Sequence, residues 1–194
     1  MEHYFSKKPK SAFIPTSFDV TFFGHSFSFV TGSGVFSIGK VDNGSRLLVE
    51  HALVHEKDSV LDYGCGWGFV GIVLGKAFPS ASFSLIDVNR RALQLSKENI
   101  LKNNVTNVSI ISSVDEVDGG YDAVLLNPPQ KAGKSVCFSM ISEAFRVLKK
   151  KGTLQLVARH QKGGKMLRAH MGEVFGNVKD HAKGSGFRVY LSEK

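Results

Sequence analysis

Residues 60–71 read VLDYGCGWGFVG. A short apolar run that is followed by closely spaced glycines and a second apolar run is typical of a buried parallel strand that enters a helix through a tight turn. Glycine is needed in such a turn because the backbone must bend sharply and must let a ligand approach within contact distance. This stretch therefore predicts a strand–turn–helix unit with a small-molecule ligand at the turn.

Outward from this unit, short apolar runs alternate with longer amphipathic ones. They predict strands at 60–62, 82–87, 108–111, 121–126 and 152–158, and helices at 70–77, 90–102, 135–148 and 162–175. Such alternation produces a parallel sheet with helices on both faces. The last two runs, 177–182 and 187–192, flank Gly184-Ser185-Gly186 and predict a terminal hairpin. We therefore predict an α/β, Rossmann-like fold with a seven-stranded, mostly parallel sheet and an antiparallel C-terminal strand.

The N-terminal residues follow a different pattern. Apolar residues alternate with smaller or polar ones at 18–22 and 27–30, around Gly24-His25, which predicts a β-hairpin. Asn43-Gly44-Ser45 is typical of a helix start. A chain of 194 residues has room for one α/β domain with a single sizeable core. We predict an N-terminal extension over residues 1–55, made of the hairpin and a capping helix, and one domain over residues 56–194.

The composition narrows the classes of partner. The formal net charge is +8, and such a surface favours polyanions through phosphate contacts and counterion release. Cys65 and Cys137 form no Cys-x-x-Cys pair, so we expect neither a disulfide nor a metal site. No run approaches the roughly 20 apolar residues of a membrane span. The first residues do not resemble a signal peptide, so we expect a cytoplasmic protein.

The glycine spacing favours S-adenosylmethionine over a dinucleotide. A dinucleotide fingerprint would place a glycine at position 69, where the chain has Phe69, and the glycines stand instead at 64, 66 and 68. S-adenosylmethionine carries a sulfonium and an ammonium group but no phosphate, so the acidic Asp62 beside the turn suits it and would repel a pyrophosphate. Capping of the turn is the alternative role for Asp62.

A second acid strengthens this interpretation. Asp87 ends the second predicted strand about 20 residues further on, where one carboxylate can accept both ribose hydroxyl groups. The alternative role of Asp87 is to cap the next helix. Ser113 follows the third strand, where enzymes that bind S-adenosylmethionine usually offer a polar residue to the adenine amino group. The predicted cofactor-binding residues are Asp62, Gly64, Cys65, Gly66, Asp87, Val88, Ser113 and Asn127.

The fourth predicted strand ends in Asn127-Pro128-Pro129. Two prolines remove two backbone donors and fix φ, so the chain past the strand is stiff and presents its carbonyl groups outward. A planar amine donates two hydrogens, which the Asn127 side-chain oxygen and the Pro128 carbonyl can accept. We therefore predict amine methylation by orientation and electrostatics, with Asn127, Pro128 and Pro129 as the catalytic residues. Asn127→Asp is then expected to retain more activity than Asn127→Ala, because a carboxylate still accepts the amine hydrogen.

The chain resembles the small-domain (MTS) Rossmann-like methyltransferases, in particular those that form N2-methylguanine in small-subunit ribosomal RNA and their short archaeal relatives. The matching segments are Gly34-Val35-Phe36-Ser37 with Asp42, Gly44 and Ser45, and residues 62–66, 87–92, 127–129 and 175–178. The resemblance implies a class I methyltransferase fold in which the segment 34–45 closes over cofactor and substrate. Two features depart from the family: bacterial members resemble a duplicated two-domain protein, and Gln130 replaces an aromatic that often stacks on the base.

Cations follow the acceptor motif and the fifth predicted strand, at the edge where parallel sheets bind ligands. The predicted substrate-binding residues are Phe36, Gln130, Lys131, Lys134 and Arg159, with His160, Lys162 and Lys165 close by in the sequence. We expect the cations to bind RNA phosphates, and a solvated basic surface is the alternative. Lys7, Lys8 and Lys10 are consistent with an RNA-binding arm or with a solubilising tail.

The sequence thus predicts an S-adenosylmethionine-dependent N-methyltransferase that acts on an exocyclic amino group of RNA, with guanine N2 in ribosomal RNA as the first choice. Two alternatives stay open. One is methylation of adenine N6 or protein glutamine N5 with the same Asn-Pro-Pro geometry. The other is a non-catalytic RNA-binding relative, against which the intact Asp62, Asp87 and Asn127 argue.

Overall fold

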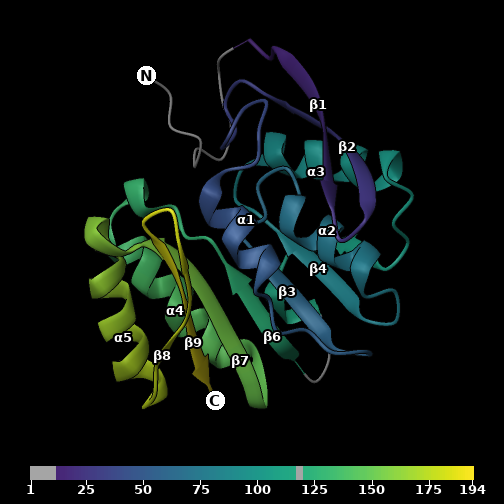
Figure 1. Cartoon of the computed structure of the whole chain (residues 1–194). Coiled ribbons are helices and arrows are strands. Elements are labelled where there is room, and N and C mark those ends of the chain that lie inside the picture. Colours follow the sequence, from purple (N-terminus) through teal and green to yellow (C-terminus); the bar gives the residue numbers. More distant parts are fainter. Residues whose placement is uncertain (1–11, 117–119) are drawn as a thin grey trace.

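A seven-stranded sheet runs through the protein, in a computed structural model that describes residues 12–116 and 120–194 (Figure 1). Its strands are β3 (Ser59–Tyr63), β4 (Ser82–Ile86), β5 (Val108–Ile110), β6 (Tyr121–Leu126), β7 (Leu148–Arg159), β8 (Lys179–Gly184) and β9 (Phe187–Glu193). They lie in the order β5-β4-β3-β6-β7-β9-β8. The pairs from β5 to β7 are parallel, and β9 is antiparallel to both of its neighbours. The predicted fold is confirmed.

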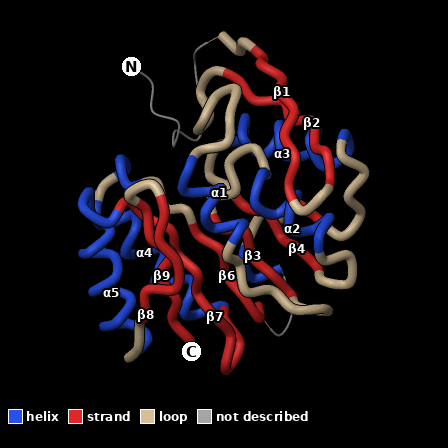
Figure 2. Tube along the Cα trace, viewed as in Figure 1, coloured by secondary structure: helices blue, strands red, loops and turns tan. Residues whose placement is uncertain are grey.

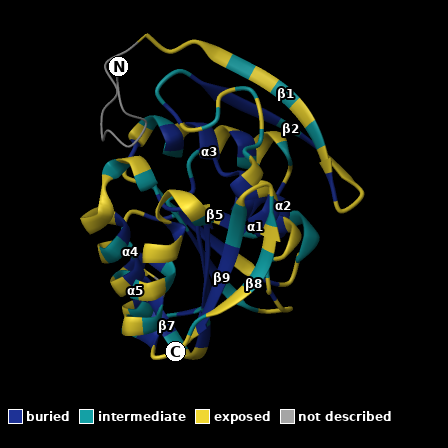
Figure 3. Cartoon of the chain, turned by 60° about the vertical axis from the view of Figure 1, so that its left-hand side comes forward, coloured by how far each residue is buried: buried dark blue, intermediate teal, exposed yellow. Residues whose placement is uncertain are grey.

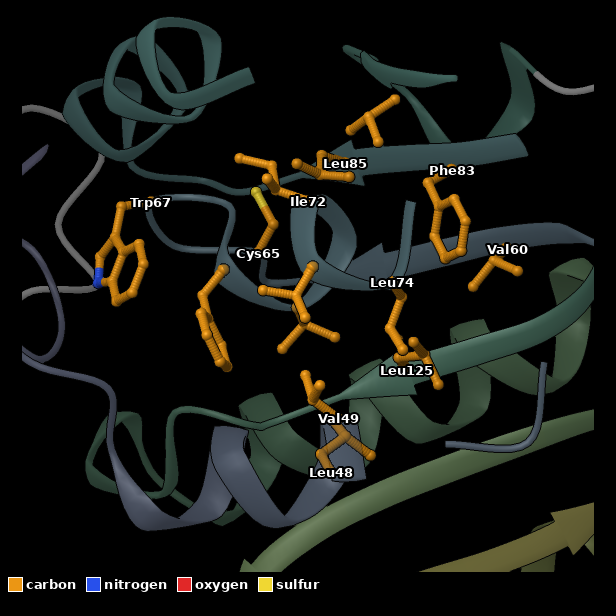
Figure 4. Close-up of a cluster of buried hydrophobic side chains, with 14 of the residues drawn as sticks. Leu48, Val49, Val60, Cys65, Trp67, Ile72, Leu74, Phe83, Leu85 and Leu125 are labelled. Atoms are coloured by element: carbon orange, nitrogen blue, oxygen red, sulfur yellow. The ribbon is translucent and has the colours of Figure 1, made fainter. Parts of the chain in front are cut away.

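Helices cover both faces of the sheet. One face carries α1 (Asn43–Glu50), α2 (Phe69–Ala77) and α3 (Arg90–Lys102), and the other carries α4 (Lys134–Val147) and α5 (Lys165–Phe175). The division follows from strand geometry, because successive side chains point to opposite faces. Val60 of β3 therefore packs with α2, whereas its neighbour Leu61 packs with α4. Figure 4 shows Leu48 and Val49 of α1 beside Leu125 of β6 in the first of these two apolar layers.

Several element boundaries differ from the sequence-based expectation. The hairpin turns at Phe23-Gly24, both with positive φ, instead of at Gly24-His25. The cap of α1 is Asp42, whose side chain accepts from the backbone of Gly44 and Ser45. Strand β7 begins at Leu148, directly after α4, and α5 begins at Lys165 because the turn His160–Gly164 before it contains a left-handed Gly163. These changes lengthen β7 and shorten α5 without altering the topology.

The N-terminal hairpin lies over α3 and joins the main core. It consists of β1 (Pro15–Phe22) and β2 (His25–Gly32). Figure 3 shows exposed and intermediate residues alternating along β1, whereas β2 is mostly buried. Phe27 and Phe29 of β2 belong to the same buried cluster as Trp67 and Phe69. The hairpin therefore packs on the same core as the sheet. The predicted boundary between the extension and the domain at residue 55 stays a prediction.

Asn99 of α3 and Asn103, which caps the C-terminal end of that helix, form hydrogen bonds with the backbone at the inner edge of β2. The Asn99 side chain is fully buried; it accepts from the N–H of Val30 at 2.8 Å and donates to the carbonyls of Val30 and Trp67. One helical turn later, Asn103 makes the equivalent pair of bonds with Ser28 at 3.0 Å. Because a buried backbone group without a partner is costly, these amides replace the strand that β2 lacks on this side. Asn99 also ties the hairpin to the loop after β3.

Within residues 12–116 and 120–194, no helix is long and apolar enough to span a membrane. The same residues contain no cluster of three or more histidine, cysteine, aspartate or glutamate side chains suited to a metal ion. The lysines at 7, 8 and 10 lie outside the described residues.

Asn99→Ala should lower the free energy of unfolding by roughly 2–4 kcal/mol, because it leaves buried backbone groups of β2 unpaired. Urea unfolding measures this loss, and amide hydrogen exchange at Val30 should speed up in the same variant. Glu98→Ala, an exposed change on the same helix, should alter stability by less than about 0.5 kcal/mol. Equal stability of the Asn99→Ala variant and the parent would show that these bonds do not hold the hairpin.

Candidate cofactor and acceptor site

The site is built where three neighbouring strands end. In the sheet, Tyr63 of β3 pairs with Ile86 of β4 on one side and with Leu126 of β6 on the other. The residues that follow are Gly64, Asp87 and Asn127. Neighbouring strands are about 4.8 Å apart, so Asp87 and Asn127 flank the glycine loop at a separation of about 10 Å. The strand order reverses at β3, and ligands of α/β sheets bind at such a switch point.

The glycine loop leaves its backbone accessible. Gly64, Gly66 and Gly68 all have left-handed φ values, of 79, 58 and 89°. The N–H groups of Gly64 and Cys65 both donate to the Ile86 carbonyl, at 2.8 and 3.0 Å, which folds the loop back over β4. A Cβ at Gly66 would meet no atom of the described chain within 4 Å, and at Gly64 it would meet only the Met140 side chain at 3.4 Å. A ligand can therefore lie against this backbone.

Asp87 fixes the loop and retains capacity for a ligand. Its Oδ2 accepts from the N–H of Gly66 at 2.9 Å, and its Oδ1 accepts from the N–H of Asn89 at 2.8 Å. Burial raises the pKa of the Asp87 carboxyl group, while the N–H groups of Asn89 and Gly66 oppose the rise. The N–H of Val88 also bonds to this carboxylate. A carboxylate has about four lone-pair sites, so Asp87 can still accept a hydroxyl group of a ligand.

Asp62 is the more deeply buried acid, with 4% of its surface exposed. Its Oδ2 accepts from the N–H of Gly71 in the first turn of α2 at 3.0 Å. Burial raises its pKa to about 7, against the bond from Gly71, and the charge of Asp87 adds to the rise. A carboxylate held in this state is suited to a cationic ligand, whose charge offsets the burial.

The three remaining cofactor residues predicted from the sequence lie in different surroundings. The Cys65 side chain is 8% exposed and packs in the core, with its Sγ 3.7 Å from the Ser96 hydroxyl, so only its backbone faces the loop (Figure 4). Val88 is 59% exposed directly after Asp87, and offers an apolar surface. Ser113 lies beyond β5, where its Oγ accepts from the backbone of Asp115 at 3.2 Å.

Asn127 has a fixed amide orientation. Its Nδ2 donates to the Ser45 hydroxyl at 3.0 Å and to Asp42 Oδ1 at 3.4 Å. Among the described residues, none donates a hydrogen bond to its Oδ1. The Pro128 carbonyl accepts from the N–H of Gln130 at 2.8 Å and keeps one lone pair. The motif thus presents two acceptor oxygens at the sheet edge.

The segment between β2 and α1 crosses the strand ends, as Figure 2 shows. The Asn89 amide donates to the Gly34 carbonyl at 2.8 Å, and Arg91 donates to the Ser33 carbonyl at 2.9 Å. The Trp67 indole donates to the Phe36 carbonyl at 2.9 Å. Trp67 itself is buried, whereas Phe36 is 37% exposed.

Gln130 joins the acceptor motif to the turn after β7. Its Nε2 donates to the Lys162 carbonyl at 2.8 Å, and its Oε1 accepts from the N–H of Arg159 at 3.3 Å. Both ends of the Gln130 amide therefore hold the turn after β7 against the acceptor motif. Three exposed cations surround this junction: Lys131, Lys134 over the Phe138 ring at 4.9 Å, and Arg159 over the Phe187 ring at 4.9 Å.

Sequence reasoning did not foresee the contacts that Asp42, Ser45 and Asn89 make at this site. Asp42 and Ser45 were recognisable only as part of a family motif, and nothing in their spacing links them to Asn127, which lies more than eighty residues away. Asn89 had a weak signal, because a polar residue directly before a helix is a common N-cap. Its bond to Gly34 has no counterpart in the sequence pattern.

The family model described as methyltransferase small domain matches residues 26–191. The chain belongs to this family. It is 34% identical, over all of its length, to the Bacillus subtilis (strain 168) protein YbxB, of which it covers 98%. It is also 35% identical, over 81% of its length, to a protein from Hahella chejuensis (strain KCTC 2396) named ribosomal RNA small subunit methyltransferase C, of which it covers 46%. The chain thus spans about half the length of the curated relatives with that name.

Solved structures show the same fold. The T. thermophilus 16S rRNA N2 G1207 methyltransferase, solved in complex with AdoMet and guanosine, superposes with a TM-score of 0.78 at 21% identity; the match covers 96% of this chain and 52% of that one. A methyltransferase from Pyrococcus furiosus gives a TM-score of 0.63 over 77% of this chain. S-adenosylmethionine is the cofactor of the methyltransferase family to which the chain belongs. The open glycine backbone and the two buried acids fit its cationic, phosphate-free chemistry.

The raised pKa of Asp62 predicts a pH-dependent stability. In the unfolded chain the carboxyl group ionises near its ordinary pKa of 3.8, but in the folded protein it ionises only near 7. The native state therefore binds more protons between these values, and stability falls as pH rises through this window and levels off above it. The stability of Asp62→Asn relative to the parent should rise from about pH 4 to about pH 7 and then stay constant, as measured by urea unfolding. A pH-independent difference would contradict the assigned pKa.

Proposed function

We propose that this protein methylates an exocyclic amino group of RNA, with guanine N2 of ribosomal RNA as its target. The observation that carries the proposal is the unclaimed Oδ1 of Asn127 beside the Pro128 carbonyl, next to the cofactor loop. These two acceptors match the two hydrogens of a planar amine. The names of the ribosomal RNA methyltransferases among its relatives support the choice of RNA.

In this proposal, the residues of the chain act by orienting the acceptor amine toward the cofactor. S-adenosylmethionine supplies an electrophilic methyl group on its sulfonium. Asp62, the loop at Gly64 and Gly66, and Asp87 would hold the cofactor, with Val88 against its base and Ser113 near the adenine edge. Asn127 Oδ1 and the Pro128 carbonyl accept the amine hydrogens, which directs the nitrogen toward the cofactor and keeps its lone pair out of the base ring. Positioning and fixed dipoles then provide the rate enhancement.

The basic residues around the acceptor motif favour a nucleic acid over a protein loop. The three residues are exposed: Lys131 lies in the turn after β6, Lys134 is the first residue of α4, and Arg159 is the last residue of β7. Phe36, which is 37% exposed on the segment between β2 and α1, would contact the base in the proposed complex. Gln130 cannot stack, since both ends of its amide are bonded to the β7 turn. The lack of an aromatic there disfavours adenine mildly, so guanine N2 remains the first choice.

Lys131→Ala should weaken RNA binding and reduce the slope of log affinity against log salt by about 0.7–0.9, because one phosphate contact is lost. Filter binding at several salt concentrations measures the slope. Lys97→Ala removes the same charge from α3, beside the far edge of the sheet at β5, and should leave RNA affinity unchanged. Identical slopes for the parent and Lys131→Ala would mean that this lysine serves only solubility.

Asn127→Ala should lower the rate of methyl transfer by about 10²–10³ while cofactor and RNA affinities stay close to the parent, because the amide oxygen aims the amine and holds neither ligand. The test is radiolabelled methyl transfer to total RNA and to assembled ribosomal subunits, followed by nucleoside analysis. Product N2-methylguanine supports the proposed target, and N6-methyladenine or a labelled protein would replace it. Near-parent turnover of a folded Asn127→Ala variant would rule out the amine mechanism.

A further inference from the structure

We propose that Asp42 and Ser45 are positioning residues of the methyl-transfer site, which hold the side-chain nitrogen of Asn127 and thereby aim its oxygen at the acceptor amine. The inference rests on the proposed function, because it explains the orientation of a residue to which that function assigns the chemistry. Both residues lie at the start of α1, far from Asn127 in the sequence and in hydrogen-bond contact with it in the fold.

The start of α1 presents two acceptors on a rigid support. Asp42 Oδ1 accepts from the N–H groups of Gly44 and Ser45 at 2.9 and 3.1 Å, which fixes the carboxylate as the helix cap. The same oxygen lies 3.4 Å from Asn127 Nδ2, and the Ser45 hydroxyl accepts from that nitrogen at 3.0 Å. Ser45 is 9% exposed, and Val49 one turn later is buried in the core. The acceptors therefore cannot move away from Asn127 without displacing the helix.

A carboxylate makes this arrangement directional. Asparagine has a donor end and an acceptor end of nearly equal size, and a half-turn of the amide exchanges them. Because Asp42 can only accept, the nitrogen of Asn127 must face it and the oxygen must face the opposite side. A reversed amide would turn two N–H donors toward an amine that is itself a donor. Holding the nitrogen therefore prepares the oxygen for the substrate before it arrives.

The same geometry reverses one expectation drawn from the sequence. Asn127→Asp was expected to keep part of the activity, since a carboxylate still accepts the amine hydrogen. In the structure, that carboxylate would lie where Nδ2 now stands, 3.4 Å from Asp42 Oδ1. Two like charges at this distance repel, and one of them must take up a proton or swing away. We therefore expect Asn127→Asp to be as inactive as Asn127→Ala near neutral pH.

The kinetic test separates positioning from helix capping. Serine and asparagine cap helices about as well as aspartate, but only asparagine is long enough to reach Asn127. Ser45→Ala and Asp42→Ser should each lower kcat roughly 5- to 10-fold, the loss of one hydrogen bond, with KM for RNA and cofactor affinity near the parent. Asp42→Asn should retain most of the activity. Val49→Ala, which destabilises α1 from the core side, should lower Tm and leave kcat unchanged.

A swapped pair provides a rescue that a structural role would not show. In the D42N/N127D double variant, the amide introduced at position 42 caps with its oxygen and donates its N–H to the carboxylate introduced at position 127. Activity should recover about 10-fold or more over Asn127→Asp alone. Parent-like kcat in Ser45→Ala and Asp42→Ser, an equal loss in Val49→Ala, or no recovery in the swapped pair would each overturn the proposal.

A readout without substrate keeps this inference separate from the proposed function. In NMR spectra, the Asn127 side-chain NH₂ signals can be assigned as those missing from Asn127→Ala. They should be protected from exchange in the parent and lose that protection in the S45A/D42S double variant. Unprotected Asn127 signals in the parent would contradict the positioning role of Asp42 and Ser45. If the signals behave as expected but the parent methylates no RNA, the proposed function fails and the positioning of the Asn127 amide stands.

Discussion

Backbone groups at the carboxyl edge of the sheet have no neighbouring strand to pair with, and carboxylate and amide side chains satisfy them instead. Asp87 accepts from the glycine loop, Asp62 accepts from the first turn of α2, and Asp42 accepts from the first turn of α1. Tight turns and helix starts expose N–H groups, so folding requires these acceptors whether or not a ligand is present. Asp62 and Asp87 keep the capacity to accept further hydrogen bonds. The residues that hold the turns in place are therefore also the residues placed to meet a ligand.

This dual use has an energetic consequence. Burial of Asp62 raises its pKa to about 7, and burial also raises the pKa of Asp87, so the two acids oppose folding wherever they are ionised. A cation placed between them stabilises the charged forms and offsets that cost. Without a cation, the buried negative charge of this site is unfavourable. The same charge makes the site complementary to a sulfonium and an ammonium group. The alternative role of Asp87 as the cap of the next helix is wrong, because Asn89 caps α3 and Asp87 accepts from the N–H groups of Gly66 and Asn89 in the loops before it. Asp62 does accept from the first turn of α2, and this bond is compatible with a role toward the cofactor.

Much of the fold could be predicted from local patterns, because apolar periodicity determines which segments pack as strands and helices. The strand–turn–helix unit at 60–71 and the Asn-Pro-Pro motif also carry their information within a few residues. Long-range bonds between side chains and backbone have no such periodicity. Asn99 and Asn103 are ordinary polar residues of a helix in the sequence, yet they complete the edge of β2. Gln130 is predicted from the sequence to bind the substrate in place of an aromatic, and its two bonds to the β7 turn could not be foreseen.

The segment between β2 and α1 connects the two halves of the site. Its Gly34 carbonyl is held by Asn89 next to Asp87, and its far end places Asp42 against Asn127. Between these anchors, Ser37 adopts a left-handed conformation that costs free energy in a residue with a Cβ. Its hydroxyl donates to the Lys40 carbonyl at 2.7 Å, which stabilises that turn locally. Because the segment is short and bonded at both ends, the order of its Asn89 end and the order of its Asp42 end depend on each other. One stretch of chain therefore contacts both the residues next to Asp87 and the acceptor motif at Asn127.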